Sequence, residues 1–580
     1  MGSIANSGYS SIGHFTSEVL ELTHLHLVLL LKQNVILKAF DFGMQLMVLR
    51  QLLENGSPVV LTMGFAAFLA ANSLSCAVSI VLVTHSALAE VVVDLMFDLI
   101  AAVVYPILVL LYYYLTFAFD RQVYLTYLET LPVGAFERLA RMFADPSEIA
   151  LFRVSFDSLR IESFLDFVLR IGLNLSFCYR FKRVMDVRAL IRRQTCLFLR
   201  EHGRKPCKSP RTQQKAVPKA IARALFAFSV AVLVYTHQAI VSSEQTCSVY
   251  PECVVHAYRF GSSSDVCQCI ILIDVDRTPM TYDQWIHPVD ACDKVKTLAA
   301  PGMLKSLQLI NRQLLEWPEE LRACRHLKTT DLVGKQGGQN LLNLPEDLFI
   351  AMPRLAWLHI GVHNQLTKVP PLSGVPNLRI RVLAWMFALK EVPSFEYVPN
   401  LQSLFMIYLP ILERLPDMSP LRSLVGFGIA GSSHICCNGF RGVCDLIDTF
   451  CVANLPNGIP GAICLEDKTD PNRAITPFLG NADTERVFEA FAPAICQKTP
   501  ADSVVYSNIP TKETIEMCSG KPFRQCYLSD GSTGICFNTR MQVLSCFANE
   551  DYIALRRLQI QKEVGLPCDP EEEKWLGCSE

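Results

Sequence analysis

Three uninterrupted apolar stretches dominate the hydrophobic pattern of the chain. They run from Pro58 to Thr84, from Leu99 to Phe119 and from Ala224 to Ser243, and none of them contains Asp, Glu, Lys or Arg. A helix needs about 20 apolar residues to cross the hydrocarbon core of a bilayer. The pattern therefore predicts an α-helical membrane region with three transmembrane helices.

Two further stretches, at residues 17–54 and 149–200, have apolar residues at three- and four-residue spacing between polar breaks. This period is typical of amphipathic helices. We interpret both as helices packed as a collar around the spans. Helices lying flat on the lipid surface are the alternative, and the pattern leaves open whether residues 149–180 enter the membrane.

The distribution of charge predicts how the spans are oriented. Residues 120–223 carry 20 Lys and Arg against 10 Asp and Glu, whereas the 85–98 loop is acidic. Cytoplasmic loops are enriched in Lys and Arg. We therefore expect a cytoplasmic N-terminus, an extracellular 85–98 loop, a cytoplasmic 120–223 loop and an extracellular region after residue 243. The basic block at 180–223 is expected to contact anionic lipid headgroups as well.

A repeated pattern occupies residues 304–435. The strand-like element Leu-x-x-Leu-x-apolar starts at Leu304, Leu355 and Leu401, with weaker copies at Leu327, Leu378 and Leu421. Apolar-Pro pairs recur between these copies, 23 to 27 residues apart. The pattern resembles the leucine-rich repeat, whose period is 20–29 residues. That resemblance implies an α/β solenoid of stacked coils with short strands on one face.

The outward positions of those strands are the candidate binding residues of the solenoid. They are Gln308, Asp331, Trp357, His359, Val382 and Phe405. Aromatic side chains are enriched at interface hot spots, so Trp357 and Phe405 are the two most important candidates. Irregular packing of the repeats is the alternative role for both. The usual inward Asn of the repeat is missing, because Arg312, His363 and Leu409 stand where it would fall.

Cysteine usage supports an extracellular region after residue 243. The chain has 22 cysteines, and 18 of them follow that residue. An even number concentrated on the predicted outer side indicates disulfide bonds in cysteine-rich caps that flank the repeats. Counting alone does not give the pairing. The candidates are Cys247, Cys253, Cys267, Cys269, Cys292, Cys324, Cys436, Cys437, Cys444, Cys451, Cys464, Cys496, Cys518, Cys526, Cys536, Cys546, Cys568 and Cys578.

No catalytic site is apparent in the sequence, and we expect no enzyme activity, cofactor or metal. Gly426-Phe427-Gly428-Ile429-Ala430-Gly431 fits the dinucleotide pattern, but no helix is expected to open on it. Asp94 and Asp98 are interpreted as a solvated helix start, with ion passage as the alternative. The net charge of −2 gives no indication of nucleic-acid binding.

These patterns divide the chain into seven parts. They are a cytoplasmic amphipathic segment (1–57), two spans (58–119, as 58–84 and 99–119), a basic cytoplasmic loop (120–223), a third span (224–243), a cysteine-rich N-cap (244–303), the repeats (304–435) and a cysteine-rich C-terminal module (436–580).

The C-terminal module ends in Trp575-Leu576-Gly577-Cys578, and Cys437-Asn438-Gly439-Phe440 lies at its start. Together with the spans, the basic loop and the repeats, these motifs resemble a group of oomycete membrane proteins with a terminal Trp-Leu-Gly-Cys (WLGC) signature domain. The resemblance implies architecture and a membrane location, and it implies no activity.

The sequence therefore predicts a multi-pass plasma-membrane protein. Its leucine-rich, disulfide-stabilised ectodomain is expected to bind an unknown protein ligand in recognition or adhesion. The alternative is an oligomeric channel or transporter whose ectodomain is regulatory.

Overall fold

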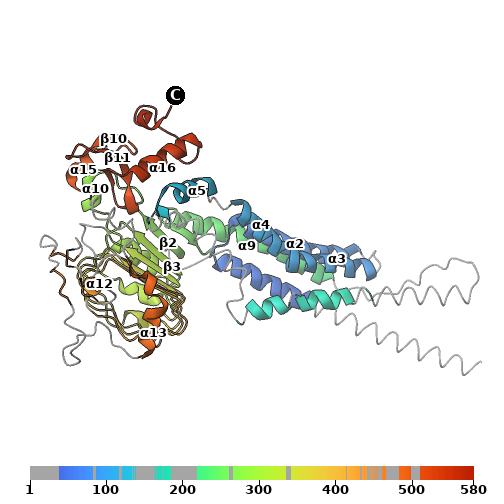
Figure 1. Ribbon diagram of the computed structural model, residues 1–580. Coiled ribbons are helices and arrows are strands. Elements are labelled where there is room, and N and C mark those ends of the chain that lie inside the picture. The colour runs from blue at the N-terminus through green and yellow to red at the C-terminus, as the bar shows by residue number, and fades with distance from the viewer. Residues whose placement is uncertain are drawn as a thin grey trace, which may run out of the picture. The chain divides into compact units, whose positions relative to one another are not determined.

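The structure is a computed structural model of the whole chain, which folds as two compact units (Figure 1). It describes residues 38–579 apart from 83–86, 117–119, 133–134, 136, 139–163, 165, 173, 183–184, 186–218, 260–265, 335–340, 413, 431–433, 440–443, 445, 448–450, 454–459, 465–481 and 498–509. Most of the basic block at 180–223, and the first 37 residues of the N-terminal segment, lie outside the described residues.

The first unit is a helical bundle. It contains the helical residues 38–54, α2 (Val59–Leu82), α3 (Ala87–Leu99), α4 (Tyr105–Thr116), the described helical residues between 164 and 182 and most of α9 (Lys219–Cys247). Among the described residues, three helices are long and apolar enough to cross a membrane, at Val59–Val81, Val92–Thr116 and Lys219–Cys247. The three predicted apolar helices are thus confirmed. A helix suits such apolar stretches because it satisfies its backbone polar groups within the segment.

The second apolar helix begins earlier than the sequence indicated. α3 continues into α4 through a π-helical turn, η1 (Ile100–Val104), so Asp94 and Asp98 lie inside one long helix. The Asp98 side chain is 5% exposed and pairs with Arg180. The interpretation of these two carboxylates as a solvated helix start is therefore wrong.

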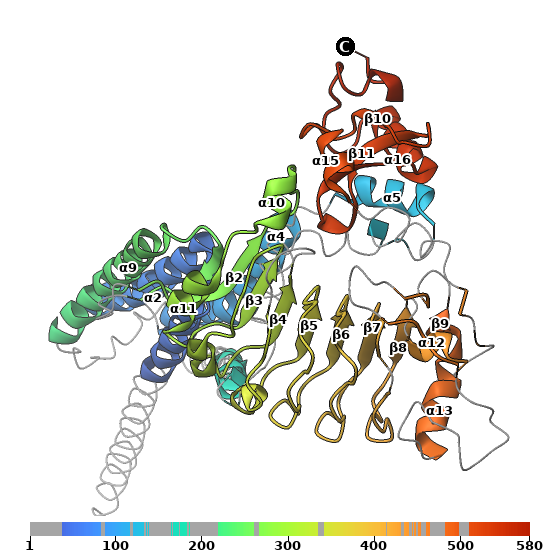
Figure 2. The same ribbon diagram turned by 90° about the vertical axis from the view of Figure 1, so that its left-hand side faces the viewer.

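The second unit contains a nine-stranded sheet in which the strands follow their order in the sequence (Figure 2). β1 and β2 are antiparallel, and all later neighbours are parallel. The strands are β1 (Cys253–His256), β2 (Cys269–Val275), β3 (Ser306–Ile310), β4 (Thr329–Val333), β5 (Trp357–Gly361), β6 (Ile380–Ala384), β7 (Ser403–Ile407), β8 (Gly426–Ala430) and β9 (Ile495–Gln497).

One repeating coil generates the parallel part of this sheet. Consecutive strands from β3 to β8 start 23 or 28 residues apart, and each pairs with the next without a register shift. Leucines at the inward strand positions, such as Leu307, Leu358 and Leu404, are buried in one continuous core. A single coil cannot bury its leucines alone, so each coil depends on its neighbours.

Short helices complete the coils and the two ends of the sheet. They are α11 (Cys292–Ala299), η2 (Glu319–Ala323), η3 (Leu348–Ala351), α12 (His434–Cys437), α13 (Ala482–Ala490) and η5 (Ala492–Ala494). The short helix α10 (Tyr282–Ile286) packs instead against the C-terminal part, where Trp285 clusters with Ile515 and Val543. α13 covers the last coil, where Phe488 packs against Phe427 of β8 with ring centroids 6.0 Å apart. The helix thereby shields from water the apolar face that the last coil would otherwise expose.

The C-terminal part folds around a three-stranded antiparallel sheet. Its elements are α15 (Lys512–Glu516), β10 (Gln525–Tyr527), β11 (Thr533–Asn538), η6 (Thr539–Met541), β12 (Leu544–Phe547), α16 (Glu550–Gln561) and η7 (Lys574–Leu576).

A helix from much earlier in the chain belongs to this C-terminal part. α5 (Arg121–Thr130) shares one hydrophobic core with β11, β12 and α16 through Val123 and Tyr127. Glu137 accepts hydrogen bonds from the Tyr552 hydroxyl and, at 2.7 Å, from the backbone N–H of Arg540. We predicted residues 120–223 as one segment, but the structure places 118–151 and 152–244 in different units.

Eight disulfide bonds form in the second unit. They are Cys247–Cys267, Cys253–Cys269, Cys436–Cys496, Cys437–Cys451, Cys444–Cys464, Cys518–Cys536, Cys526–Cys546 and Cys568–Cys578. Cys292 and Cys324, which we counted as candidates, are free thiols. Both are buried in the apolar core of the coils and pack there as small hydrophobic side chains.

Candidate binding surface

Five of the six predicted binding residues form one row across the sheet. The register pairs Gln308 of β3 with Asp331 of β4, then His359, Val382 and Phe405 of the next three strands. All five side chains are partly exposed, and Phe405 is the most exposed of them at 38%. The sixth, Trp357, belongs to the neighbouring outward row, between Thr329 and Ile380. The structure therefore brings all six to one face of the sheet.

The row changes in chemistry along its length. At one end, the Asp331 carboxylate lies 2.7 Å from Nδ1 of His359. At the other end, Val382 is followed by Phe405, which is 38% exposed. The row therefore has a polar end and an apolar end.

Two glycines in β8 determine where the Phe405 ring lies. A Cβ atom added to Gly428 would come 3.3 Å from Cδ1 of Phe405, and one added to Gly426 would come 3.5 Å from its Cζ. The ring thus lies against the glycine backbone of the next strand. These glycines belong to the dinucleotide-like motif, whose residues 426–430 form strand β8. The following helix, α12, has only four residues, so the geometry of a dinucleotide site is absent there.

Two buried basic residues occupy inward positions that normally hold apolar or Asn side chains. Arg381 stands in the row of Leu358 and Leu404, and burial lowers the pKa of its guanidinium to about 9. Among the described residues, its three side-chain nitrogens have no hydrogen-bond partner. Burial lowers the pKa of His363 to about 4, so this imidazole is neutral at pH 7. Both residues can be found from the sequence, because Arg381 replaces an inward leucine of the repeat and His363 replaces its usual Asn.

An aromatic cluster, missed by the sequence reasoning, lies just beyond the strands. Trp385 and Tyr408 directly follow β6 and β7, and both adopt positive φ angles of 54° and 50°. Their ring centroids are 4.8 Å apart, and Phe387 lies 5.4 Å from Tyr408. The guanidinium of Arg540 stacks 5.3 Å from the Trp385 ring. The sequence feature that could have revealed this cluster is the aromatic residue that directly follows the strand in two consecutive repeats.

The same position carries a backbone ladder from coil to coil. The N–H of Val362, Trp385 and Tyr408 each donates to the last residue of the next strand, at 2.8 to 2.9 Å. The left-handed conformation turns each N–H toward its neighbour. Asn311, one position before the place where the repeat usually has Asn, has the same conformation (φ 56°) and donates at 3.1 Å.

No group of three or more His, Cys, Asp or Glu in the described part of the chain has the arrangement of a metal site. The expectation that the chain has no enzyme activity, cofactor or metal stays a prediction.

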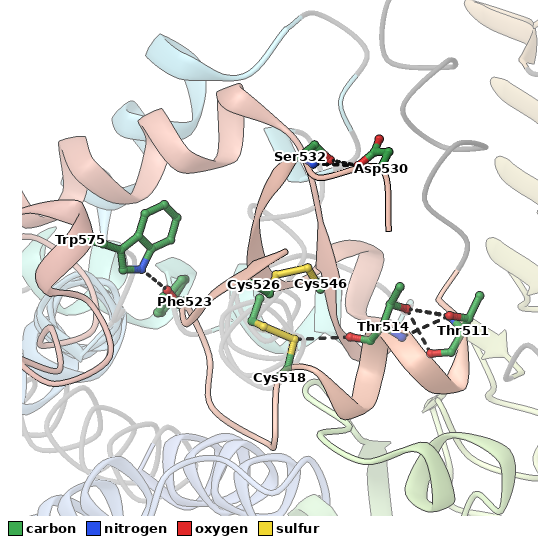
Figure 3. The surroundings of a disulfide bond; sticks show 10 residues. Thr511, Thr514, Cys518, Phe523, Cys526, Asp530, Ser532, Cys546 and Trp575 are labelled. Carbon is green, nitrogen blue, oxygen red and sulfur yellow. Dashed lines mark hydrogen bonds between the residues drawn. A yellow bond between two sulfur atoms is a disulfide. The ribbon is translucent and has the colours of Figure 1, made fainter. Parts of the chain in front are cut away.

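The final four-residue motif of the C-terminal part can be explained residue by residue. Trp575 donates from Nε1 to the backbone oxygen of Phe523 at 3.1 Å (Figure 3), and Leu576 is buried in the core shared with α5. Gly577 ends η7 at φ 100°, a conformation that favours glycine. Cys578 closes the disulfide with Cys568.

A buried ion pair lies next to this motif and supports it. Nε of Arg556 lies 2.6 Å from Oε2 of Glu573, and the two side chains are 1% and 3% exposed. The guanidinium also stacks 4.1 Å from the ring centroid of Phe523, the residue that accepts from Trp575. The ion pair, the Trp hydrogen bond and the disulfide thus hold the last turn of the chain against the sheet.

Comparison with known proteins bears on this last region. No curated protein matches the chain. Residues 513–579, which contain the motif, the ion pair and three of the disulfides, match the WLGC domain family.

Proposed function

We propose that this chain is an integral plasma-membrane protein that presents a leucine-rich-repeat ectodomain for protein recognition or adhesion. The apolar helices support a membrane location, and eight disulfides support an oxidising compartment for the second unit. The stacked coils, with inward leucines and a period of 23 or 28 residues, support the leucine-rich-repeat assignment. The WLGC domain follows these coils as a second module of the same ectodomain.

The observation that carries this proposal is the outward row from Gln308 to Phe405. In a solenoid, the usual binding positions are the outward side chains of the strands, on the sheet face that no other element covers. The row also offers a paired acid and imidazole beside an exposed aromatic ring, which is the mixed chemistry of a protein interface.

A photo-crosslinking experiment on intact cells tests the proposal. A photoreactive amino acid at Val382 is expected to capture a discrete protein partner, because this position lies between His359 and Phe405 in the outward row. The same substitution at Ile350, which is 66% exposed on η3, is the matched control and is expected to capture none. Absence of a product specific to Val382 would contradict the proposal.

The two aromatic candidates provide the second half of the test. Trp357→Ala combined with Phe405→Ala is expected to abolish the crosslink at Val382 while the protein still reaches the cell surface with its disulfides formed. Retention of the double variant inside the cell would assign both side chains to repeat packing.

One observation favours transport as a second candidate function. Arg180 contacts Asp94 and Asp98 at 3.1 and 2.9 Å within the helical bundle, and buried charges in membrane helices are often functional. Flux through reconstituted vesicles that is lost on Asp94→Asn with Asp98→Asn would support it. Unchanged flux in that variant would count against it.

A further inference from the structure

The structure brings two additional helices into the bundle, at residues 38–54 and 164–182. We propose that both also cross the membrane, so that five helices cross it and the outer faces of these two contact lipid acyl chains. This inference depends on the membrane location proposed above. It replaces the collar and the lipid-surface helix that the sequence left as alternatives.

The exposure pattern of the helix at 164–182 is inverted relative to a helix in water. Most of its exposed described side chains are apolar, among them Phe164 at 81% and Leu175 at 63%, while Arg180 is buried. A water-facing amphipathic helix exposes its charges instead. Apolar side chains outside and a charge inside are the arrangement expected in lipid.

The buried charges of both helices are neutralised inside the bundle. Arg180 pairs with Asp41 of the first helix and with Asp94 and Asp98 of α3, and Lys38 pairs with Asp94. The side chains of Arg180, Asp41 and Asp98 are at most 6% exposed. Pairing of this kind lowers the cost of placing charged groups in a bilayer.

Contacts along the two helices fix their relative direction. Gln51 donates to Asp166 at 2.5 Å, and ten residues earlier Asp41 accepts from Ser176, also at 2.5 Å. Between these contacts, Gly172 lets Met44 approach closely, since a Cβ at this position would overlap the Met44 side chain. The two helices are therefore antiparallel over most of their length.

Each helix is nearly long enough to cross. At 1.5 Å per residue, the 17 described helical residues of each account for about 25 Å, compared with a hydrocarbon core of about 30 Å. Residues 38–54 run directly into α2 through a turn at 55–58, as a pair of crossing helices would.

That turn identifies the outer end of the bundle. The backbone N–H of Tyr258 donates to the carbonyl of Leu53 at 2.9 Å, and Ser243 near the end of α9 contacts Arg259. Cys247, the last residue of α9, forms a disulfide and so lies on the oxidising side. The end of the first helix and the start of α2 therefore lie at this side, and α2 runs inward.

The chain then returns outward through α3 and α4 and reaches α5. Residues packed in one water-excluded core lie on one side of a membrane, and α5 shares a core with β11, β12 and α16. A wholly cytoplasmic 120–223 loop and an extracellular C-terminal module therefore cannot both exist. With α5 outside and the start of α9 inside, an odd number of crossings must separate them, and the helix at 164–182 supplies one.

The charges of the revised loops agree with this path. Residues 118–163, now outside, carry five Lys and Arg and seven Asp and Glu, whereas residues 183–218, now inside, carry ten and two. Basic residues are enriched in cytoplasmic loops. The basic block thus keeps its predicted side, whereas residues 118–163 move to the outer side and the connection between α2 and α3 moves to the inner side.

Two single-cysteine reporters separate three crossings from five, because each topology predicts the opposite pattern. They are built in a variant whose other unpaired cysteines are replaced, and a membrane-impermeant maleimide is applied to intact cells. Five crossings predict that Gln122→Cys is labelled and that His85→Cys is labelled only after permeabilisation. Three crossings predict the reverse, and that result, or any other pattern of the two, would overturn the inference.

A third reporter tests the proposed function separately. Lys512→Cys, on an exposed part of α15, is expected to be labelled on intact cells under both topologies. If it is protected, the ectodomain is not extracellular, and the proposed function fails whatever the number of crossings. Surface biotinylation of each variant shows that the protein has reached the plasma membrane before the labels are compared.

Discussion

Two adjacent glutamates in the WLGC domain allow the effect of burial on an ion pair to be measured directly. Glu573 and Glu572 each make a two-pronged contact with an arginine: Arg556 at 2.6 and 3.1 Å, and Arg524 at 2.7 and 2.6 Å. The Arg556–Glu573 side chains are 1% and 3% exposed, whereas those of Arg524–Glu572 are 33% and 16% exposed.

The perturbation is Glu573→Gln, with Glu572→Gln as its matched control. Glu573→Gln keeps the shape but leaves the Arg556 charge buried without an anion, which costs about 3–5 kcal/mol of folding free energy. That cost corresponds to an increase of about 150- to 5,000-fold in the unfolded fraction, at 1.36 kcal/mol per factor of ten. Glu572→Gln is expected to cost below about 1 kcal/mol, because water screens the partly exposed pair.

The assay is brief proteolysis of the purified full chain in detergent at increasing urea concentration, following the fragment that carries the C-terminus. The transition of Glu573→Gln is expected at much lower urea than that of Glu572→Gln. Replacing both partners, as Arg556→Met with Glu573→Leu, is expected to restore most of the stability, since no buried charge remains. Equal shifts for the two glutamine variants would refute the reasoning.

Three further predictions concern other features of the second unit. Burial lowers the pKa of His363 from 6.5 to about 4, so the unfolded state binds more protons than the folded state between these pH values. The free energy of unfolding should therefore fall by about 3 kcal/mol as the pH drops from 6.5 to 4. His363→Asn should weaken this pH dependence in urea titrations at several pH values. Gly577→Ala should destabilise the last turn by about 1–2 kcal/mol, because φ is 100° there, and an unchanged urea midpoint would contradict this. Carbodiimide treatment should join the Glu129 carboxyl of α5 to the Lys562 amine of α16 as an amide, detected as a crosslinked peptide by mass spectrometry, since the two side chains form an ion pair at 2.6 Å. Absence of that crosslinked peptide from the surface protein would argue against this packing.

The parts of the fold that sequence predicted well are those set by local pattern. The apolar runs gave three helices, and the leucine spacing placed Gln308, Asp331 and His359 correctly in one row, because period and register are properties of consecutive residues. The apolar pattern predicts that the second helix starts at Leu99, which is too late, since Asp94 and Asp98 interrupt the apolar run. A charge that is neutralised by a distant partner looks like a boundary when only the sequence is read.

The parts that sequence missed depend on contacts between distant segments. Val123 and Tyr127 have helical spacing, but nothing near them reveals that their partners lie beyond residue 530. Arg180 likewise reads as one member of a basic block, although it is buried against three carboxylates. Cys292 and Cys324 could not be told from bonded cysteines, because pairing depends on geometry in space.

The completion of the WLGC domain by α5 has a consequence in time. Glu137 and Tyr552, which bond in the finished domain, are 415 residues apart. At 5–20 residues per second, a ribosome needs about 20–80 s to make the intervening chain. During that interval the apolar face of α5 has no partner, so it is exposed to chaperones and to aggregation. For the same reason, a recombinant fragment cut at the boundaries of the family match would lack this helix, and supplying residues 118–138 as a separate chain is expected to improve its solubility.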